Sequence, residues 1–455
     1  MKRKYRKEST LAAILFLSLL LFGCSNEGNN SSDQGGANPQ ARPVTPEAEQ
    51  EPEPVTLTFY VGGGTLTNTE FELFFEQPTK EKFPHITLEK LTPADGVTAA
   101  EVLVSSEPPD IIYLTSSSFH SFLELEALAD LDELVEKHQF EVNRLKPYLV
   151  ESIQNFTPQG NLFTLPFSSN VAALFYNKDI FNRFSVAYPP DEQLTWEQLL
   201  EIAAQLTRNE GGVQYIGTDI NNSPASLQGS YGIFALDAAT GEPILQSEQW
   251  KIVFKLYEQS VSIPGYVQNE IYQYDRDSFL VDQNLAMRPT LLANLIGPLE
   301  ELRKEGKPMN WDIAPIPNFA DQLGAGKVAN VHSVSISASS KHKDEAFQVL
   351  ANILSDEVQR IVARNGRVPA IDKQELELEF GADIEVLQGK KIENIFKTTT
   401  PVLAQHRWEN DVAKHLNQAF ADIALNGIDT NTALRNAEDA ITKELETLKL
   451  TKPQQ

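Results

Sequence analysis

The chain has 455 residues, of which 41% are hydrophobic and 22% charged, and its formal net charge is −25 at pH 7. A chain of this length exceeds the size at which one hydrophobic core keeps growing, so two lobes are expected. The acidity argues against a nucleic acid partner, because phosphate backbones are bound through lysine and arginine. It favours instead a soluble chain with little non-specific adhesion.

A targeting segment is predicted at the start of the chain. Five basic residues lie between Lys2 and Lys7, and residues 11–22 are largely apolar. That run is too short to span a bilayer as a helix, so residues 1–23 are interpreted as a signal peptide. The sequence Leu21-Phe22-Gly23-Cys24 resembles the lipobox of bacterial lipoproteins, although Phe22 is bulkier than the small residue usual there. The resemblance implies that Cys24 becomes the lipid-modified first residue of the mature chain.

Cys24 is the sole cysteine, so an internal disulfide and a metal-thiolate cluster are both excluded. The alternative for this residue is a lone buried thiol. Residues 25–54 consist mainly of Asn, Gly, Ser, Gln, Glu and Pro, a composition that buries too little apolar surface to fold. Residues 24–54 are therefore expected to form a lipidated, disordered tether.

The folded part is predicted to open with a strand, a glycine turn and a helix. Residues 55–61 alternate apolar and polar side chains, Gly62-Gly63-Gly64 follows, and a helix is expected over residues 70–77. This order is typical of the first unit of a parallel sheet. A phosphate-binding loop is disfavoured, because the Walker lysine and the dinucleotide glycine spacing are both absent. The glycines are expected to allow close approach of the backbone to a ligand.

A second buried strand is predicted over residues 108–114, with the sequence PPDIIYL. Thr115, Ser116, Ser117 and Ser118 follow it directly. Hydroxyl groups at the carboxyl end of a parallel strand lie where open α/β sheets bind ligands. The alternative for each serine is a helix cap.

Residues 165–206 contain a chain crossing, a strand and a helix. Pro166 favours extended backbone, and residues 171–176 form a short apolar run of strand length. Thr195 and Gln198 have the spacing of a capping box. Behind them, apolar residues recur at helical spacing from Trp196 onwards, so a helix with one buried face is predicted.

The sequences YNKDIF at residues 176–181 and TWEQLLEIAAQL at residues 195–206 resemble those of extracellular solute-binding proteins of ABC importers, of the sugar-binding, maltose-binding-protein-like type. The resemblance implies an α/β fold of the periplasmic-binding-protein type II, with two lobes. Each lobe is expected to be a mixed or parallel sheet flanked by helices. The first lobe is expected to comprise residues 55–168 and 332–375, and the second residues 169–331 and 376–455. Three hinge crossings are expected, near residues 166–170, 330–332 and 371–378.

The resemblance continues through Ser278-Phe279-Leu280, residues 286–288, residues 311–317 and residues 332–346, and two amphipathic helices are predicted to close the chain around Gly427. Residues 217–219 and 229–232 are expected to be loops. Members of the family commonly continue after the segment at residues 286–288 into a glycine and a tryptophan that stacks on the sugar. This chain has Pro289-Thr290-Leu291-Leu292-Ala293 there, so one expected stacking residue is missing.

The resemblance also implies ligand contacts. Asn170 matches a hinge position that contacts the ligand, and its alternative role is a structural hinge hydrogen bond. Trp408 follows a proline-containing loop and is predicted to be the main stacking platform, with a place in the core as the alternative. Trp196, Trp250 and Trp311 are expected to be core residues. The residues expected to contact the ligand are Tyr60, Gly63, Ser116, Ser117, Asn170, Asp219, Tyr231, Arg288 and Trp408.

Catalytic signatures are missing from the sequence. The histidines lack the metalloprotease spacing, and no G-x-S-x-G nucleophile motif occurs. Carboxylates are so numerous that a glycosidase pair would be arbitrary. No catalytic residue, metal or cofactor is therefore predicted.

The predicted function is a lipid-anchored substrate-binding protein of an ABC importer, which captures a small polar solute by closure of its two lobes. Carbohydrate is the expected ligand class, with peptide or polyamine as the alternative, and a secreted glycosidase as the alternative from another class. The expected partners are the solute, the membrane-embedded permease subunits and, through the lipid anchor, the membrane. The protein is expected to be a monomer at the extracytoplasmic face of the bacterial cell membrane.

Overall fold

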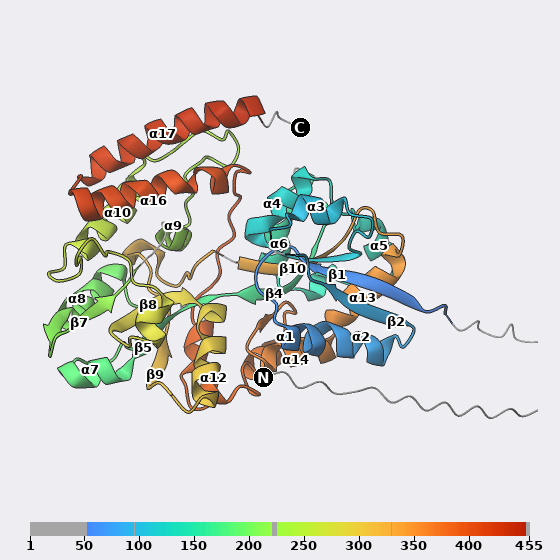
Figure 1. Ribbon diagram of the computed structural model, residues 1–455, viewed down its shortest axis with the longest axis horizontal. Helices are drawn as coiled ribbons and strands as arrows, with labels where there is room; N and C mark the ends of the chain where they lie inside the picture. Colours follow the sequence, from blue (N-terminus) through green and yellow to red (C-terminus); the bar gives the residue numbers. More distant parts are fainter. Residues whose placement is uncertain (1–51, 95, 158, 221–224, 329, 452–455) are drawn as a thin grey trace, which may run out of the picture. The chain divides into compact units, whose positions relative to one another are not determined.

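Two β-sheets, each flanked by helices, make up the folded part of the chain (Figure 1). The computed structural model describes residues 52–455 except 95, 158, 221–224, 329 and 452–455. The predicted signal peptide, Cys24 and the tether up to residue 51 lie outside the described residues. No helix within the described part of the chain is long and apolar enough to cross a membrane.

The first lobe is built on a six-stranded mixed sheet with the strand order β11-β4-β10-β3-β1-β2. β1 pairs in parallel with β2 and β3, whereas β10 runs antiparallel to β3 and β4. The strands are β1 Val55–Val61, β2 Ile86–Leu91, β3 Ile111–Thr115, β4 Leu165–Asn170, β10 Asn330–Ile336 and β11 Val368–Pro369. The strands predicted at residues 55–61 and 108–114 are thus confirmed.

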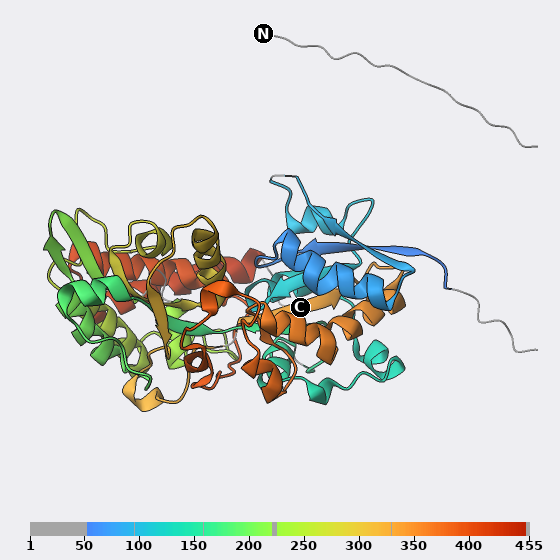
Figure 2. The ribbon, with the colours of Figure 1, turned by 90° about the horizontal axis from the view of Figure 1, so that it is seen from below.

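The helices of the first lobe come from two separate parts of the chain, residues 68–154 and 343–378. Figures 1 and 2 show α2 and α13 side by side, and Asn352 Nδ2 donates a hydrogen bond to Pro78 O at 3.0 Å between them. The predicted helix at residues 70–77 is part of a longer run with a π-helical turn in its middle, η1. The helical elements are α1 Asn68–Phe71, η1 Glu72–Glu76, α2 Gln77–Lys82, α3 Ala99–Leu103, α4 Ser116–Glu124, α5 Asp132–Lys137, η2 Val142–Arg144, α6 Pro147–Gln154, α13 Lys343–Ile353, α14 Asp356–Arg364 and α15 Gln374–Leu378.

The second lobe is built on a five-stranded mixed sheet with the order β6-β7-β8-β5-β9. β7 and β8 are parallel, and β5 runs antiparallel to both of its neighbours. The strands are β5 Ala172–Asn177, β6 Arg208–Glu210, β7 Val213–Thr218, β8 Leu285–Leu291 and β9 Trp311–Ala314. The buried strand predicted over residues 171–176 is β5.

The helices of the second lobe include the one predicted most directly from sequence. In the capping box of α8, Thr195 N donates to Gln198 Oε1 at 2.9 Å and Gln198 N donates to Thr195 Oγ1 at 3.2 Å, as predicted. The helical elements are α7 Lys178–Phe184, α8 Trp196–Leu206, α9 Ala225–Tyr231, α10 Glu248–Val261, α11 Arg276–Leu280, η3 Leu292–Asn294, α12 Ile296–Lys304, η4 Ala320–Gln322, η5 Glu385–Leu387, η6 Ile392–Phe396, α16 Glu409–Asn426 and α17 Thr430–Thr451. Gly427 ends α16 in the left-handed conformation with φ 63°, as expected between the last two helices.

Each lobe has its own apolar core. In the first lobe, the aromatic rings of Phe59, Phe75 and Phe167 pack against one another in the core. In the second lobe, Trp196 and Trp250 lie on one face of the sheet and Trp311 on the other. The prediction that these three tryptophans are core residues is confirmed.

The segments at residues 217–219 and 229–232 were expected to be loops, and this expectation is wrong for most of them. Gly217 and Thr218 belong to β7, and residues 229–231 belong to α9. A Cβ at Gly217 would lie 2.1 Å from the backbone oxygen of Ala203 in α8. The glycine therefore permits close packing of strand against helix, which its sequence context does not distinguish from a turn.

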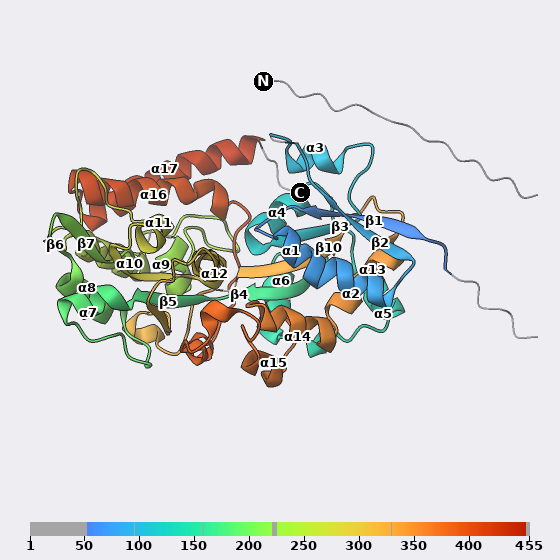
Figure 3. The ribbon, with the colours of Figure 1, turned by 60° about the horizontal axis from the view of Figure 1, so that its bottom comes forward.

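The crossings join the last residues of one sheet to the first of the other. β4 ends at Asn170 in the first sheet, and β5 begins at Ala172 in the second (Figure 3). β10 begins at Asn330 and belongs to the first sheet from that residue onwards. The two ends of β4 and β10 that pair with each other, Asn170 and Asn330, thus lie next to each other at the crossings.

Candidate functional site

The turn after β1 lies against the start of α4. A Cβ at Gly63 would lie 2.2 Å from Ser118 Oγ, and Gly64 has a φ of +75° that favours glycine. The glycines therefore allow the turn to approach the chain's own helix. This packing accounts for them without a ligand, and a ligand contact at Gly63 stays a prediction.

The hydroxyl groups after β3 have different partners. Ser118 Oγ accepts a hydrogen bond from Thr115 N at 3.1 Å, which is the helix-cap alternative. Ser116 Oγ accepts from Val331 N in β10 at 2.8 Å, so it ties α4 to a crossing strand. Ser117 is exposed, and its Oγ lies 3.0 Å from Thr115 Oγ1. Of the two predicted contact serines, Ser117 has the more accessible hydroxyl group.

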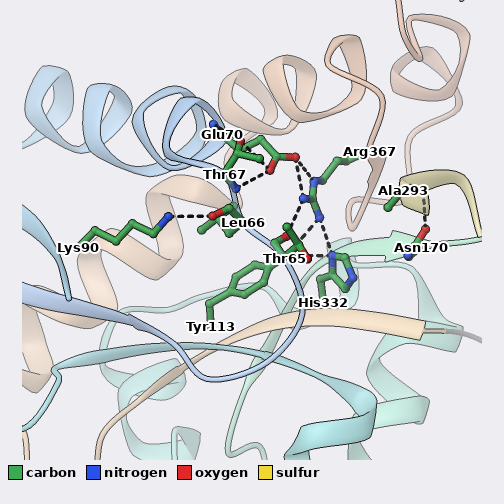
Figure 4. Close-up of polar contacts among 10 residues, drawn as sticks. All are labelled: Thr65, Leu66, Thr67, Glu70, Lys90, Tyr113, Asn170, Ala293, His332 and Arg367. Carbon is green, nitrogen blue, oxygen red and sulfur yellow. Dashed lines mark hydrogen bonds and ion pairs between the residues drawn. The ribbon is translucent and has the colours of Figure 1, made fainter. Parts of the chain in front are cut away.

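An arginine that sequence reasoning did not select organises the first-lobe side of the site (Figure 4). Arg367 donates from Nε and Nη2 to Glu70 Oε1 at 2.8 and 2.6 Å, and from Nη2 to Thr65 O at 3.1 Å. Its Nη1 lies 2.6 Å from His332 Nδ1 and 3.2 Å from Tyr113 Oη. The guanidinium thus joins α1, β3, β10 and the turn after β1.

The electrostatics of this group fix its protonation states. Burial, together with the charge of Arg367, lowers the pKa of His332 to about 3. Burial raises the pKa of Tyr113 to about 12, against the opposing effect of Arg367. His332 is therefore neutral, and its Nδ1 accepts hydrogen bonds from Arg367 and from the Tyr113 hydroxyl, which lies at 2.8 Å.

The amide of Asn170 makes a hydrogen bond between the lobes. Its Oδ1 accepts from Ala293 N in η3 at 3.2 Å (Figure 4). This contact is the structural hinge hydrogen bond that the sequence left as the alternative. Leu292 is buried next to it, in the segment where the expected tryptophan is missing. A ligand contact at Asn170 stays a prediction.

In the second lobe, two predicted site residues come together. Asp219 follows β7 and accepts from Tyr274 N at 2.6 Å, and Arg288 in β8 donates from Nη1 to Tyr274 O at 2.7 Å. Burial lowers the pKa of Arg288, and the charge of Asp219 opposes this effect. Arg288 Nε and the hydroxyl groups of Tyr257 and Tyr266 are buried without a hydrogen-bond partner among the described residues.

The two predicted tyrosines differ in accessibility. Tyr231, at the end of α9, is half-buried; its hydroxyl donates to Asp321 Oδ2 at 2.8 Å, and its ring packs edge-on against Phe319. Burial and the neighbouring carboxylate raise the pKa of Tyr231 to about 12. Tyr60 is buried in the apolar cluster around Phe122, and burial raises its pKa. Tyr231 therefore offers a partly open ring, whereas Tyr60 is enclosed.

Trp408 was predicted to be the main stacking platform, and the structure argues against that role. The residue is 2% exposed and belongs to the apolar core of the second lobe. The guanidinium of Arg407 lies 4.7 Å from its ring centre. This is the core alternative stated from the sequence, because an indole enclosed in this way has no face for a solute.

The start of α16 nevertheless contacts the first lobe. Asn410 Nδ2 donates to Ser117 O at 3.1 Å, which joins the beginnings of α16 and α4. Within the described part of the chain, no group of three or more His, Cys, Asp or Glu side chains is placed to hold a metal ion. The polar groups at this site can bind and orient a solute through hydrogen bonds.

Two sheets with paired crossings and polar groups on both sides define a two-lobed α/β binding protein. Residues 67–360 match the sequence profile of the bacterial extracellular solute-binding proteins. The match covers more than half of the chain, and the chain belongs to this family. It is thus a binding protein rather than an enzyme, as expected from the sequence.

Three individual proteins that resemble this chain are 18–24% identical to it in sequence. A protein of Brucella abortus (strain 2308) that bears the name of a binding protein is 24% identical over 302 residues, which cover 63% of this chain and 69% of the relative. A sugar transporter structure from Rhizobium etli, in an open conformation, aligns with a TM-score of 0.68 and 18% identity over 85% of this chain and 99% of its own. An ABC substrate-binding protein from Listeria monocytogenes in complex with cycloalternan aligns with a TM-score of 0.67 and 19% identity over 87% and 100%. These similarities show the two-lobed type II fold that was predicted.

Proposed function

We propose that the protein captures a neutral sugar or oligosaccharide between its lobes and delivers it to the permease of an ABC importer. The observation that carries the ligand class is the lack, among the described residues, of an exposed, unengaged arginine near the predicted contacts. Arg367 is bonded to Glu70, and Arg288 is buried and donates to the backbone of Tyr274. Neither is therefore available as a free cation for a peptide carboxylate. Hydroxyl, amide and tyrosine groups suit a neutral polyol better.

Similar structures support the sugar assignment. The Listeria monocytogenes protein was solved with cycloalternan, and a related protein from Thermotoga lettingae with α-D-tagatose at a TM-score of 0.66. The polyamine alternative has less support than a sugar, because the ligands named in these two similar structures are carbohydrates.

A thermal-shift panel tests the ligand class. Maltotriose, mannobiose and cycloalternan are compared with spermidine and a tripeptide, each at millimolar concentration, and the sugars are recovered afterwards by chromatography. A ligand at 100 times its Kd adds about 2.7 kcal/mol to the free energy of unfolding, so a sugar is expected to raise the melting temperature by several degrees. A shift with spermidine or the peptide alone would contradict the proposal, and released reducing sugar would favour a glycosidase.

We further propose that the mature chain is anchored through a lipid on Cys24, which places it at the extracytoplasmic face of the cell membrane as a monomer. The support is the lipobox-like sequence and the family's extracellular location. Each buried CH₂ adds about 0.8 kcal/mol to membrane binding, so two acyl chains would hold the protein stably. Cys24→Ser is expected to release the protein from the membrane fraction. A cleaved variant that remains in the membrane would exclude the anchor.

A further inference from the structure

The third connection between the lobes runs from β11 through α15 to η5 and η6. Its hinge was expected within residues 371–378. The hydrogen bonds and ion pairs along the connection instead change from the first lobe to the second at Ile384. We propose that Ile384, between Asp383 and Glu385, is the pivot of this connection. The residues that form ion pairs on its two sides hold each side of the connection to its own lobe, and so position the pivot during lobe closure.

The backbone before the pivot is fixed to the first lobe. Gly381 N donates to Ala363 O at 2.9 Å, and Asp383 N donates to Arg364 O at 3.0 Å, both in α14. α14 itself is held to the sheet, because Gln359 Nε2 donates to a backbone oxygen of β4 at 3.2 Å. The backbone is therefore hydrogen-bonded to the first lobe as far as Asp383, whereas the ring of Phe380 already packs in the apolar cluster of the second lobe.

The predicted hinge segment is also part of the first-lobe core. Ile371 and Leu376 are buried in the same apolar cluster as the strands of the first sheet. Lys146, at the start of α6, forms an ion pair with Glu377 of α15. A bend within residues 371–378 would disrupt these buried contacts, whereas a bend at Ile384 leaves them intact.

Ion pairs strengthen the attachment before the pivot. Arg364 Nε donates to Asp383 Oδ2 at 3.0 Å, and Arg364 Nη1 donates to Glu379 Oε2 at 3.1 Å. Arg360 Nε reaches the other oxygen of Glu379 at 2.9 Å. One face of α14 thus holds two carboxylates of the connection, and the second of them directly precedes Ile384.

Directly after the pivot, the contacts belong to the second lobe. Arg303 Nη1 lies 2.5 Å from Glu385 Oε2, and Val386 N donates to Glu300 Oε2 at 3.0 Å, both on α12. Further along, Lys391 N donates to an aspartate of β9 at 3.0 Å. Two carboxylates separated by one residue, at positions 383 and 385, are therefore attached to different lobes.

Ile384 has the surroundings of a bending point. Its backbone is extended, with φ −105° and ψ 109°. A Cβ at Gly366 of the first lobe would lie 2.6 Å from Ile384 Cδ1 and 3.8 Å from Ile296 Cγ2 of α12. The isoleucine side chain thus sits where the lobes meet. Apolar contacts are not directional, so they tolerate rotation better than hydrogen bonds do.

The contacts that span the pivot are compatible with rotation. Gln388 Nε2 donates to Ala382 O at 3.2 Å on the surface, and the rings of Phe380 and Phe396 meet edge to face at 5.7 Å. Gly381 also packs against the side chain of Leu387, whose Cδ1 lies 2.3 Å from where a Cβ of Gly381 would be. Gln388 and Ala382 are within a few residues of the pivot, where a rotation displaces atoms least. The ring contact is apolar and can slide.

The inference rests on the proposed function only in requiring that the lobes move. Spin-label distances can therefore be measured without any sugar, so that failure of sugar binding and misplacement of the pivot are seen separately. In a full-length chain carrying Cys24→Ser, one label is placed at Leu378, which is 80% exposed, or at the exposed Glu393. The second label is placed at Glu136 in the first lobe or Glu201 in the second, both exposed.

The pivot at Ile384 predicts two narrow and two broad distance distributions. Leu378 is expected to keep a narrow distribution to Glu136 and a broad one to Glu201, and Glu393 the reverse. The proposal is overturned if Leu378 tracks the second lobe, which places the pivot before it, or if Glu393 tracks the first. Four equally narrow distributions would also overturn it, because the connection would then not bend.

A matched pair of variants tests the ion pairs. Arg364→Gln removes the ion pairs of Arg364 with Glu379 and Asp383, leaving Glu379 only its pair with Arg360, and is expected to broaden the Leu378–Glu136 distribution. Arg303→Gln removes the ion pairs of Arg303 with Glu300 and Glu385 on the other side of the pivot and should leave that distribution unchanged. Thermal unfolding of both variants verifies that they are folded. Equal distributions in the two variants would show that the pairs do not position the pivot.

Discussion

Each lobe buries an arginine, and the two arginines differ in how completely they are hydrogen-bonded. In the first lobe, Arg367 is bonded to Glu70, Thr65, Tyr113 and His332, so groups from separate parts of the chain hold it in place. In the second lobe, Arg288 bonds to the backbone of Tyr274, but its Nε has no partner within the described part of the chain. The arginine of the first lobe thus has hydrogen-bond partners at each of its guanidinium nitrogens, whereas the arginine of the second lobe has a nitrogen without one among the described residues.

The difference has energetic consequences. A network in which every buried polar group has a hydrogen-bond partner is rigid. Removing one member leaves the remaining groups buried without that partner, which lowers the free energy of unfolding. A buried hydroxyl that has no partner already carries that cost, so removing it does not destabilise the fold and can stabilise it. The first-lobe network should therefore be sensitive to substitution, and the unpaired tyrosines of the second lobe tolerant of it.

The largest effect in the first lobe is expected for Arg367→Met. The variant leaves Glu70 only its bonds with Thr67 and His332 only its bond with Tyr113. Because the Glu70 side chain is 26% exposed, the loss should be about 3 kcal/mol, the lower end of the range for breaking a buried charged pair. Urea unfolding measures the loss. Arg360→Met removes an arginine of the same lobe from an exposed pair with Glu379 and should change the unfolding free energy little. Similar losses in both variants would contradict the account of the network.

An effect of comparable size is expected in the second lobe for Trp408→Ala. Because the indole is enclosed in the core, its truncation should cost about 3–5 kcal/mol of unfolding free energy. Sugar binding by the folded variant should be retained, as measured by calorimetry. Arg407→Ala, which removes only the guanidinium above the ring, is the control. A stable Trp408→Ala variant that has lost binding would restore the stacking role.

The next prediction concerns how the stability of the first-lobe network depends on pH through His332. The pKa of His332 is about 3 in the folded protein, below the ordinary value of 6.5, so the unfolded chain binds more protons between these pH values. Stability is therefore expected to fall as the pH decreases from 6.5 towards 3, by about 2–4 kcal/mol from this residue. His332→Gln should reduce that slope in denaturant unfolding measured at several pH values. An identical slope in both proteins would show that the histidine titrates freely.

The smallest effects on stability are expected for Tyr113 and Tyr266, two tyrosines that are both fully buried. Tyr113→Phe removes a hydroxyl bonded to His332 and should cost about 1–3 kcal/mol. Tyr266→Phe removes a hydroxyl without a partner among the described residues, so the unfolding free energy should stay the same or rise by about 1 kcal/mol. Both variants keep the ring, so packing is matched. A loss of stability for Tyr266→Phe would mean that its hydroxyl has a partner.

Local patterns in the sequence predicted much of the fold. The capping box at Thr195 and Gln198 gave the start of α8, and the alternation over residues 55–61 gave β1. These signals depend on neighbours in the chain, so they can be read without knowing the fold. Glycines were less informative, because Gly217 serves close packing in a strand, and the same residue type is used in turns.

The site was harder to predict, because it is made by contacts between distant segments. Arg367 and Glu70 are 297 residues apart, and neither lies in a motif that indicates the pair. Trp408 follows a proline-containing loop, and that pattern does not show whether the ring is enclosed in the core. Asp219 and Arg288 were both selected and do come together around Tyr274, although both are buried. Side-chain environments of this kind require the tertiary structure.

Small-angle X-ray scattering tests the central claim, capture of a sugar by lobe closure, most directly. The Cys24→Ser protein is measured alone and with a saturating concentration of whichever panel sugar raises the melting temperature most. Closure of two lobes around a ligand predicts a smaller radius of gyration in the presence of that sugar. An unchanged radius of gyration, at a sugar concentration shown by calorimetry to saturate the protein, would contradict the account.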